Sequence, residues 1–193
     1  MKRITIFCGS SAGKDDHYMQ QAFLLGKTLA QQGIGVVYGG AKVGLMGAVA
    51  DGALSVKGEV IGVLPHFLRN LELQHDGLAQ LILVDSMHER KTKMNELCDG
   101  IIALPGGFGT LEELFEILTW GQLGLHHKPV AMLNTNGYYD SMFKLFEGMV
   151  KEGFLKEENR KMVLVNDNID ALITSMKEYT PPATGKWLTK ERS

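Results

Sequence analysis

Short apolar runs separated by longer amphipathic segments dominate the pattern of this 193-residue chain. The runs are four or five residues long and mostly end at Gly, Pro or Asn, which is typical of β-strands. Most show no alternation of apolar and polar positions, which indicates strands covered on both faces, as in a parallel sheet. The predicted strands are Ile4–Cys8, Ile34–Tyr38, Val60–Leu64, Leu81–Val84, Ile101–Leu104, Val130–Leu133 and Met162–Val165.

Helical patterns fill the intervals between these strands. Strand–helix–strand repetition predicts an α/β fold, a doubly wound, Rossmann-like and mostly parallel sheet of about seven strands with helices on both faces. We expect one domain over residues 1–180 and an extended tail over 181–193, either anchored by Trp187 or free. The predicted helices are Asp15–Gln32, Leu45–Val56, Met87–Cys98, Leu111–Leu123, Tyr138–Lys151 and Ile169–Tyr179.

Glycine-rich turns follow three of the strands, at Gly9–Ser11, Gly39–Gly40 and Pro105–Thr110. In an open α/β sheet, ligands bind outside the carboxyl ends of the strands, near the point where the strand order reverses. The three turns are therefore expected at the ligand-binding edge.

The turn Pro105–Thr110 is the strongest candidate for a phosphate site. Gly106, Gly107 and Gly109 can adopt positive φ angles and let the backbone approach a ligand. We expect Thr110 to open a helix, whose free N–H groups favour an anion. The turn matches neither the P-loop nor the dinucleotide-binding pattern, which argues against triphosphate chemistry. A tight turn that needs glycine and binds nothing is the alternative.

Two carboxylates follow this turn. Thr110 and Glu113 match the S/T-x-x-E capping box, in which Glu113 folds back onto the helix start and is only structural. In the functional interpretation, Glu113 lies about one helical turn from a bound phosphate, near the sugar of a nucleoside monophosphate. Glu112 is the other candidate for that role.

Two cations interrupt the apolar stripe of the segment Met87–Cys98. A helical projection places Arg90 and Lys91 inside the stripe formed by Met87, Met94 and Cys98. Cations on a core-facing side are costly unless they meet an anion, which predicts that both face a ligand pocket. Snorkelling of their stems to the sheet edge is the alternative.

Composition mainly excludes classes of protein and kinds of site. The formal net charge of −2 gives no basic field for nucleic acid. No run approaches about 18 apolar residues, so neither a membrane span nor a signal peptide is predicted. Cys8 and Cys98 are expected to be buried free thiols in a reducing cytosol. The pair His126–His127 lacks accompanying ligands, so no metal site is expected.

The motifs together resemble the LOG ("lonely guy") family. Pro105–Glu113 fits its P-G-G-x-G-T-x-x-E motif, and Met87–Lys91 fits its M-H-x-R-K segment. Similarity extends from about residue 3 to residue 165 and includes Tyr38–Gly40, Val43–Gly47 and Thr119–Gly124. The resemblance implies a homodimeric enzyme, and no cofactor is expected. A cytoplasmic location is expected because neither a signal peptide nor a membrane span is predicted. It would hydrolyse the N-glycosidic bond of nucleoside 5′-monophosphates, such as cytokinin riboside monophosphates and AMP, to free base and ribose 5-phosphate.

By position, the resemblance also implies roles for individual residues. Arg90 and Glu113 would be catalytic. The implied substrate contacts are Glu72, Arg90, Lys91, Gly106, Gly107, Gly109, Thr110, Glu112 and Thr119. Considered by itself, Glu72 is an ordinary loop carboxylate.

Other function classes compete with this hypothesis. A non-catalytic nucleotide- or cofactor-binding protein on the same fold would show the same turn. A pyridoxal-phosphate decarboxylase needs a Schiff-base lysine and an acidic partner for the pyridine nitrogen, and the sequence shows no such constellation. A nucleic-acid-binding protein is disfavoured by the negative net charge.

Overall fold

The computed structural model describes residues 1–69 and 74–182. Glu72, Trp187 and the tail from residue 183 onward lie outside this range. The predicted domain boundary at residue 180 and the extended tail therefore stay predictions.

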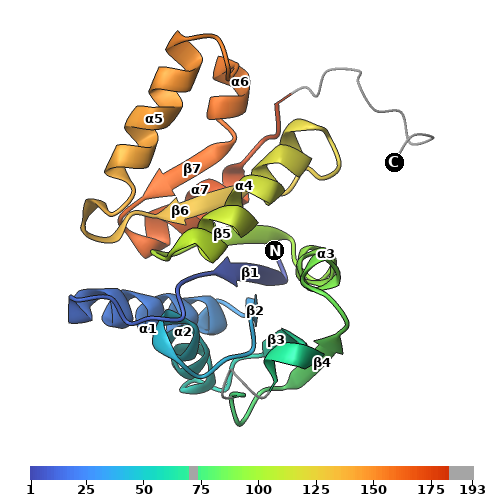
Figure 1. Cartoon of the computed structure of the whole chain (residues 1–193). Helices are drawn as coiled ribbons and strands as arrows, with labels where there is room; N and C mark the ends of the chain where they lie inside the picture. The colour runs from blue at the N-terminus through green and yellow to red at the C-terminus, as the bar shows by residue number, and fades with distance from the viewer. Residues whose placement is uncertain (70–73, 183–193) are drawn as a thin grey trace.

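A single sheet of seven strands runs through the centre of the molecule (Figure 1). Its order is β4-β3-β2-β1-β5-β6-β7, and every neighbouring pair is parallel. The predicted doubly wound α/β fold is confirmed, and each predicted strand is present within one residue of its expected ends. The strands are β1 (Arg3–Phe7), β2 (Gly35–Tyr38), β3 (Val60–Pro65), β4 (Gln80–Val84), β5 (Gly100–Ala103), β6 (Val130–Leu133) and β7 (Val163–Asn166).

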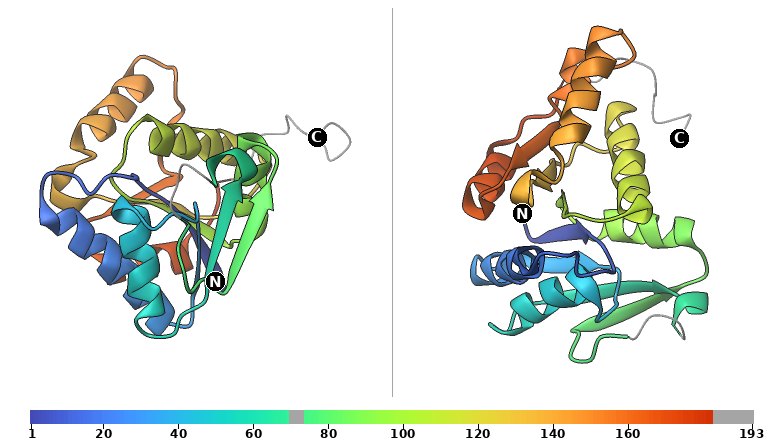
Figure 2. Two further views of the ribbon diagram at one scale, coloured as in Figure 1. Left: turned by 60° about the horizontal axis from the view of Figure 1, so that its bottom comes forward. Right: turned by 60° about the vertical axis from the view of Figure 1, so that its left-hand side comes forward.

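Helices cover both faces of the sheet, and the right-hand view of Figure 2 shows the two layers. One apolar core joins the sheet to α1, α2 and α7, and a second joins it to α3, α4 and α5. This double cover explains why the strands are apolar at nearly every position. The helices are α1 (Asp16–Gln31), α2 (Gly44–Leu54), α3 (Met87–Glu96), α4 (Phe108–Gln122), α5 (Asp140–Lys151), α6 (Glu157–Arg160) and α7 (Ile169–Glu178), with 3-10 turns η1 (His66–Leu68) and η2 (Thr135–Gly137).

The six long helices correspond to the predicted ones, with differences at their ends. The largest is in α4, which begins at Phe108 rather than Leu111. The short α6 and both 3-10 turns were not predicted, because three or four residues are too few to show a helical period.

The strand order reverses between β1 and β5, which pair with each other in the middle of the sheet. The turns that follow these two strands are joined directly, because the N–H of Gly9 donates to the carbonyl of Pro105 at 3.1 Å. The glycine-rich turns after β1 and β5 therefore meet at the switch point, where ligands bind in folds of this class.

Both cysteines are free and buried, as expected. Within residues 1–69 and 74–182, none of the helices has the length and apolar character needed to cross a bilayer.

Candidate active site

The turn after β5 leads directly into α4, which starts earlier than the sequence suggested. Gly107 is the N-cap residue, and Thr110 is already the third residue of the helix. The predicted capping box is therefore wrong, because Thr110 does not occupy the cap position and Gly107 has no side chain to cap with. Glu113 is thus not explained as a capping residue.

Limited space, rather than an unusual backbone angle, explains why residue 106 of this turn is glycine. Gly106, Gly107 and Gly109 can adopt positive φ, but none of the three does so in the structure. A Cβ on Gly106 would lie 2.1 Å from Thr110 Oγ1, which no side chain permits. At Gly107 and Gly109 a Cβ would meet no atom within 4 Å. These two glycines therefore leave their backbone open to a ligand.

Two tyrosines beyond β6 hold the turn from outside. The hydroxyl of Tyr138 donates to the carbonyl of Gly106 at 2.6 Å, and that of Tyr139 donates to the carbonyl of Leu104 at 2.5 Å. Sequence reasoning missed both residues. The available signal was their position just after the carboxyl end of β6, the strand beside β5.

Arg90 projects from α3 into the sheet edge, where it is only 7% exposed. Its Nε donates to the carbonyl of Val63 at 3.0 Å, and Nη2 donates to the carbonyl of Gly39 at 3.1 Å. A Cβ on Gly39 would lie 2.1 Å from Nη2, so the second glycine-rich turn makes room for the guanidinium. The carbonyls after β2 and within β3 thus fix the orientation of Arg90.

The carboxylate of Glu113 faces this guanidinium from α4, with 4.0 Å between Oε1 and Arg90 Nη1. The Glu113 side chain is 13% exposed. Burial raises the pKa of Glu113 to about 7, although the positive charge of Arg90 opposes the shift. A carboxylate that titrates near neutrality next to a buried cation is typical of an active site.

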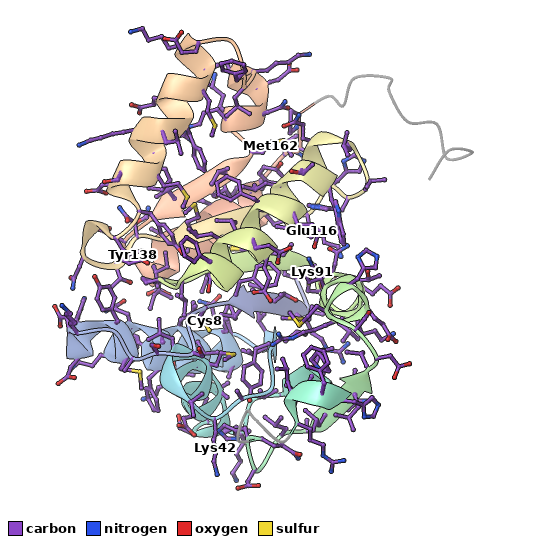
Figure 3. The ribbon with its side chains drawn as sticks, viewed as in Figure 1. Cys8, Lys42, Lys91, Glu116, Tyr138 and Met162 are labelled. Atoms are coloured by element: carbon purple, nitrogen blue, oxygen red, sulfur yellow. The ribbon has the colours of Figure 1, made fainter. Side chains whose placement is uncertain are left out.

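Lys91 points to the neighbouring side of α4. Its Nζ lies 2.6 Å from Glu112 Oε1 and 2.8 Å from Glu116 Oε2, and Figure 3 shows Lys91 next to Glu116. The two carboxylates raise the pKa of Lys91 and outweigh its desolvation, which acts in the opposite direction and is the largest single influence. Lys91 therefore bridges α3 and α4, and its predicted substrate contact stays a prediction.

A cavity of about 230 Å³ at the switch point contains Arg90, Glu113 and the start of α4. Its lining includes Ser10, Arg90, Gly107, Thr110, Glu112 and Glu113. Cys8 forms part of the wall, and burial raises the pKa of its thiol, so this thiol stays protonated. A second cavity of about 380 Å³, bounded by Tyr18 and Tyr138, adjoins the first at Gly9, Ser10 and Gly107.

Three predicted site residues do not line this cavity, namely Lys91, Gly106, which lines the second cavity, and Thr119. Thr119 belongs to a different part of α4. It lies nine residues beyond Thr110, about 13 Å along the axis of α4. Its hydroxyl donates to the carbonyl of Phe115 at 2.8 Å, and its side chain borders a separate apolar cavity between α4 and α5. Glu72 lies outside the described residues.

In the pair His126–His127, the first histidine has a structural role. His126 is buried, with Nε2 2.8 Å from the carbonyl of Ile117, and burial lowers its pKa. Within the part of the chain that the structure describes, no cluster of three or more His, Cys, Asp or Glu side chains could hold a metal ion.

Comparisons with known proteins point to one family. A family model described as "Possible lysine decarboxylase" matches residues 46–176. Cytokinin riboside 5'-monophosphate phosphoribohydrolase LOG7 of Arabidopsis thaliana is 43% identical over 180 residues, which cover 93% of this chain and 83% of that protein. The corresponding LOG enzyme of Oryza sativa subsp. japonica is 42% identical, with coverage of 93% and 74%.

Solved structures confirm the fold at lower identity. The molybdenum cofactor binding protein from Rippkaea orientalis superposes with a TM-score of 0.70 at 23% identity, over 92% of this chain and 97% of that one. The Moco carrier protein from Chlamydomonas reinhardtii gives a TM-score of 0.67 at 22% identity, over 91% and 95%. These similarities concern the fold alone.

Proposed function

This chain belongs to the LOG family, and we propose that it hydrolyses the N-glycosidic bond of a nucleoside 5′-monophosphate to free base and ribose 5-phosphate. Its relatives are named as phosphoribohydrolases of cytokinin riboside 5'-monophosphates, and we propose these nucleotides and AMP as substrates. The observation that carries the proposal is the Arg90–Glu113 pair, which shares one cavity with the start of α4.

The start of α4 suits the 5′-phosphate. The first N–H groups of a helix have no acceptor within it, and the helix dipole adds partial positive charge. Gly107 and Gly109 leave these groups uncovered, because neither carries a side chain. We therefore assign the phosphate to the backbone from Gly107 to Thr110.

Glu113 suits the sugar. It lies one helical turn beyond Thr110 and lines the same cavity. Cleavage of a ribosyl bond passes through an oxocarbenium-like transition state, which a nearby carboxylate stabilises. In our proposal, ionised Glu113 stabilises the developing cation or activates the attacking water.

Arg90 is placed to contact the nucleotide beyond its phosphate. Because two backbone carbonyls fix its Nε and Nη2, Nη1 is the nitrogen turned toward Glu113. We propose that Arg90 positions the nucleotide or assists the departing base. Lys91, Glu112, Thr119 and Glu72 are further proposed substrate contacts.

A homodimer and a cytoplasmic location complete the proposal. Apolar side chains on and beyond α4 support self-association, since Phe108 is 93% exposed and Phe115, Leu123 and Leu125 are also exposed. Two free, buried thiols support a reducing compartment. Sedimentation analysis of the purified protein tests the dimer directly.

The decisive experiment incubates purified protein with AMP and with isopentenyladenosine monophosphate, and quantifies base and ribose 5-phosphate. Release of both products in equal amounts supports the proposal. The second candidate is a non-catalytic nucleotide- or cofactor-binding protein, since the cavity alone could serve for binding. Tight nucleotide binding without release of base would favour that candidate.

A further inference from the structure

We infer that Tyr138 is a positioning residue that fixes the orientation of the Gly106–Gly107 peptide, so that the N–H of Gly107 faces the phosphate. This inference rests on the proposed binding of a nucleoside monophosphate. The hydroxyl of Tyr138, a residue labelled in Figure 3, donates to the carbonyl of Gly106 at 2.6 Å. In a trans peptide the C=O and the following N–H point in opposite directions. Holding the carbonyl toward Tyr138 therefore turns the N–H of Gly107 away from it.

Two adjoining cavities lie beside the turn and share Gly9, Ser10 and Gly107. Tyr138 lines the cavity of about 380 Å³, whereas Arg90 and Glu113 line the cavity of about 230 Å³. Gly107 borders both cavities. In our inference, the N–H directed away from Tyr138 serves the cavity that contains Glu113, which Gly107 also borders.

A glycine–glycine peptide needs such an external constraint. Without Cβ atoms on either side, rotation of this peptide plane meets little steric resistance. The opposite orientation would present a carbonyl oxygen to an anion and remove one N–H donor. The preceding carbonyls are also occupied, since Leu104 accepts from Tyr139 and Pro105 accepts from the N–H of Gly9. The carbonyls of Leu104, Pro105 and Gly106 are therefore each held by a donor from a distant part of the chain.

Tyr138 can be tested without disturbing the core. It is 45% exposed, and its ring packs edge-on against Tyr18 at 6.1 Å and Tyr139 at 5.0 Å between ring centroids. A phenylalanine keeps these ring contacts and deletes only the hydroxyl. Tyr18→Phe is the matched control, because it deletes a hydroxyl from the wall of the same cavity. Among the described residues, no hydrogen bond joins the Tyr18 hydroxyl to the turn.

The experiment measures AMP turnover by steady-state kinetics and ribose 5-phosphate binding by calorimetry, with adenine as the ligand that lacks phosphate. For Tyr138→Phe we expect KM for AMP and the dissociation constant of ribose 5-phosphate to rise about tenfold, the range of one hydrogen bond to a charged group. The kcat should stay within about twofold, because the lost interaction acts on substrate and transition state alike. Adenine affinity and the Tyr18→Phe variant should be unchanged.

Unchanged ribose 5-phosphate binding in Tyr138→Phe would overturn the inference, as would equal weakening of adenine and ribose 5-phosphate. The calorimetric measurement needs no turnover. If the wild-type protein releases no base but Tyr138→Phe still binds ribose 5-phosphate more weakly, the proposed hydrolysis fails and the inference stands. If the wild-type protein is active and both variants bind ribose 5-phosphate equally, only the inference fails.

Discussion

Replacing Glu113 by Gln should lower the rate of hydrolysis strongly and at the same time stabilise the protein at pH 8. The substitution keeps the shape of the side chain and removes its charge. Loss of a carboxylate that acts as base or stabilises an oxocarbenium ion should lower kcat by about 10²- to 10⁴-fold. This corresponds to about 3–5 kcal/mol of lost transition-state stabilisation.

The stability effect follows from burial. The pKa of Glu113 is raised from 4.5 to about 7 in the folded protein. Between these values the native state binds more protons than the unfolded state, so stability falls as pH rises through this window and levels off above it. At about 1.4 kcal/mol per pH unit, the ionised carboxylate costs the native state about 3 kcal/mol above pH 7.

Urea unfolding at pH 5 and pH 8 measures this difference. Glu113→Gln should exceed the wild-type free energy of unfolding by about 1 kcal/mol at pH 5 and by about 3 kcal/mol at pH 8. Glu116→Gln, three residues further along α4 and 26% exposed, is the matched control and should keep its turnover. A Glu113→Gln protein with normal turnover, or one less stable than the wild type at pH 8, would refute the reasoning.

The remaining predictions concern pH and the glycine turn. In the wild type, kcat/KM for AMP should rise with pH through about 7 as Glu113 ionises, and a flat profile from pH 5 to 8 would contradict this. Arg90→Met should move that rise to higher pH, because Arg90 lowers the pKa of Glu113, and a shift to lower pH would refute the assignment. Gly106→Ala should destabilise the fold by about 1–3 kcal/mol, since its Cβ would lie 2.1 Å from Thr110 Oγ1. Gly107→Ala should leave stability unchanged, because its Cβ meets no protein atom, and should raise KM for AMP, because the methyl group would cover the backbone proposed to bind phosphate. Thermal unfolding measures the stability of the two variants, and steady-state kinetics measures their KM.

Much of the fold could be predicted because its signals are local. An apolar run of four or five residues identifies a strand buried on both faces, and the predicted strands are confirmed at their expected places. The position of Arg90 in the apolar stripe of α3 correctly indicated a cation turned inward, since the structure buries it against the carbonyls of Val63 and Gly39. A charge on an apolar face needs a partner, and this requirement is visible before the partner is known.

The capping box shows where a local pattern misleads. Thr110 and Glu113 have the right spacing, but α4 begins at Phe108, so the pattern falls inside the helix. The first residue of a helix depends on the conformation of the turn before it. Here hydrogen bonds from Gly9 and Tyr138 fix that turn. Those donors come from distant parts of the sequence.

By itself, the sequence determined the strands, the helices, the glycine turn and the residue types that could act there, because periodicity and motif spacing are properties of neighbouring residues. Tertiary structure alone decided that Arg90 and Glu113 lie 4.0 Å apart, that burial brings the pKa of Glu113 to about 7, and that Lys91 binds Glu112 and Glu116. It also brought Tyr138 to Gly106 across 32 residues of chain. These features depend on which strands are neighbours in the sheet and on how much water the packed elements exclude. Neither property can be read from the residues of one segment alone.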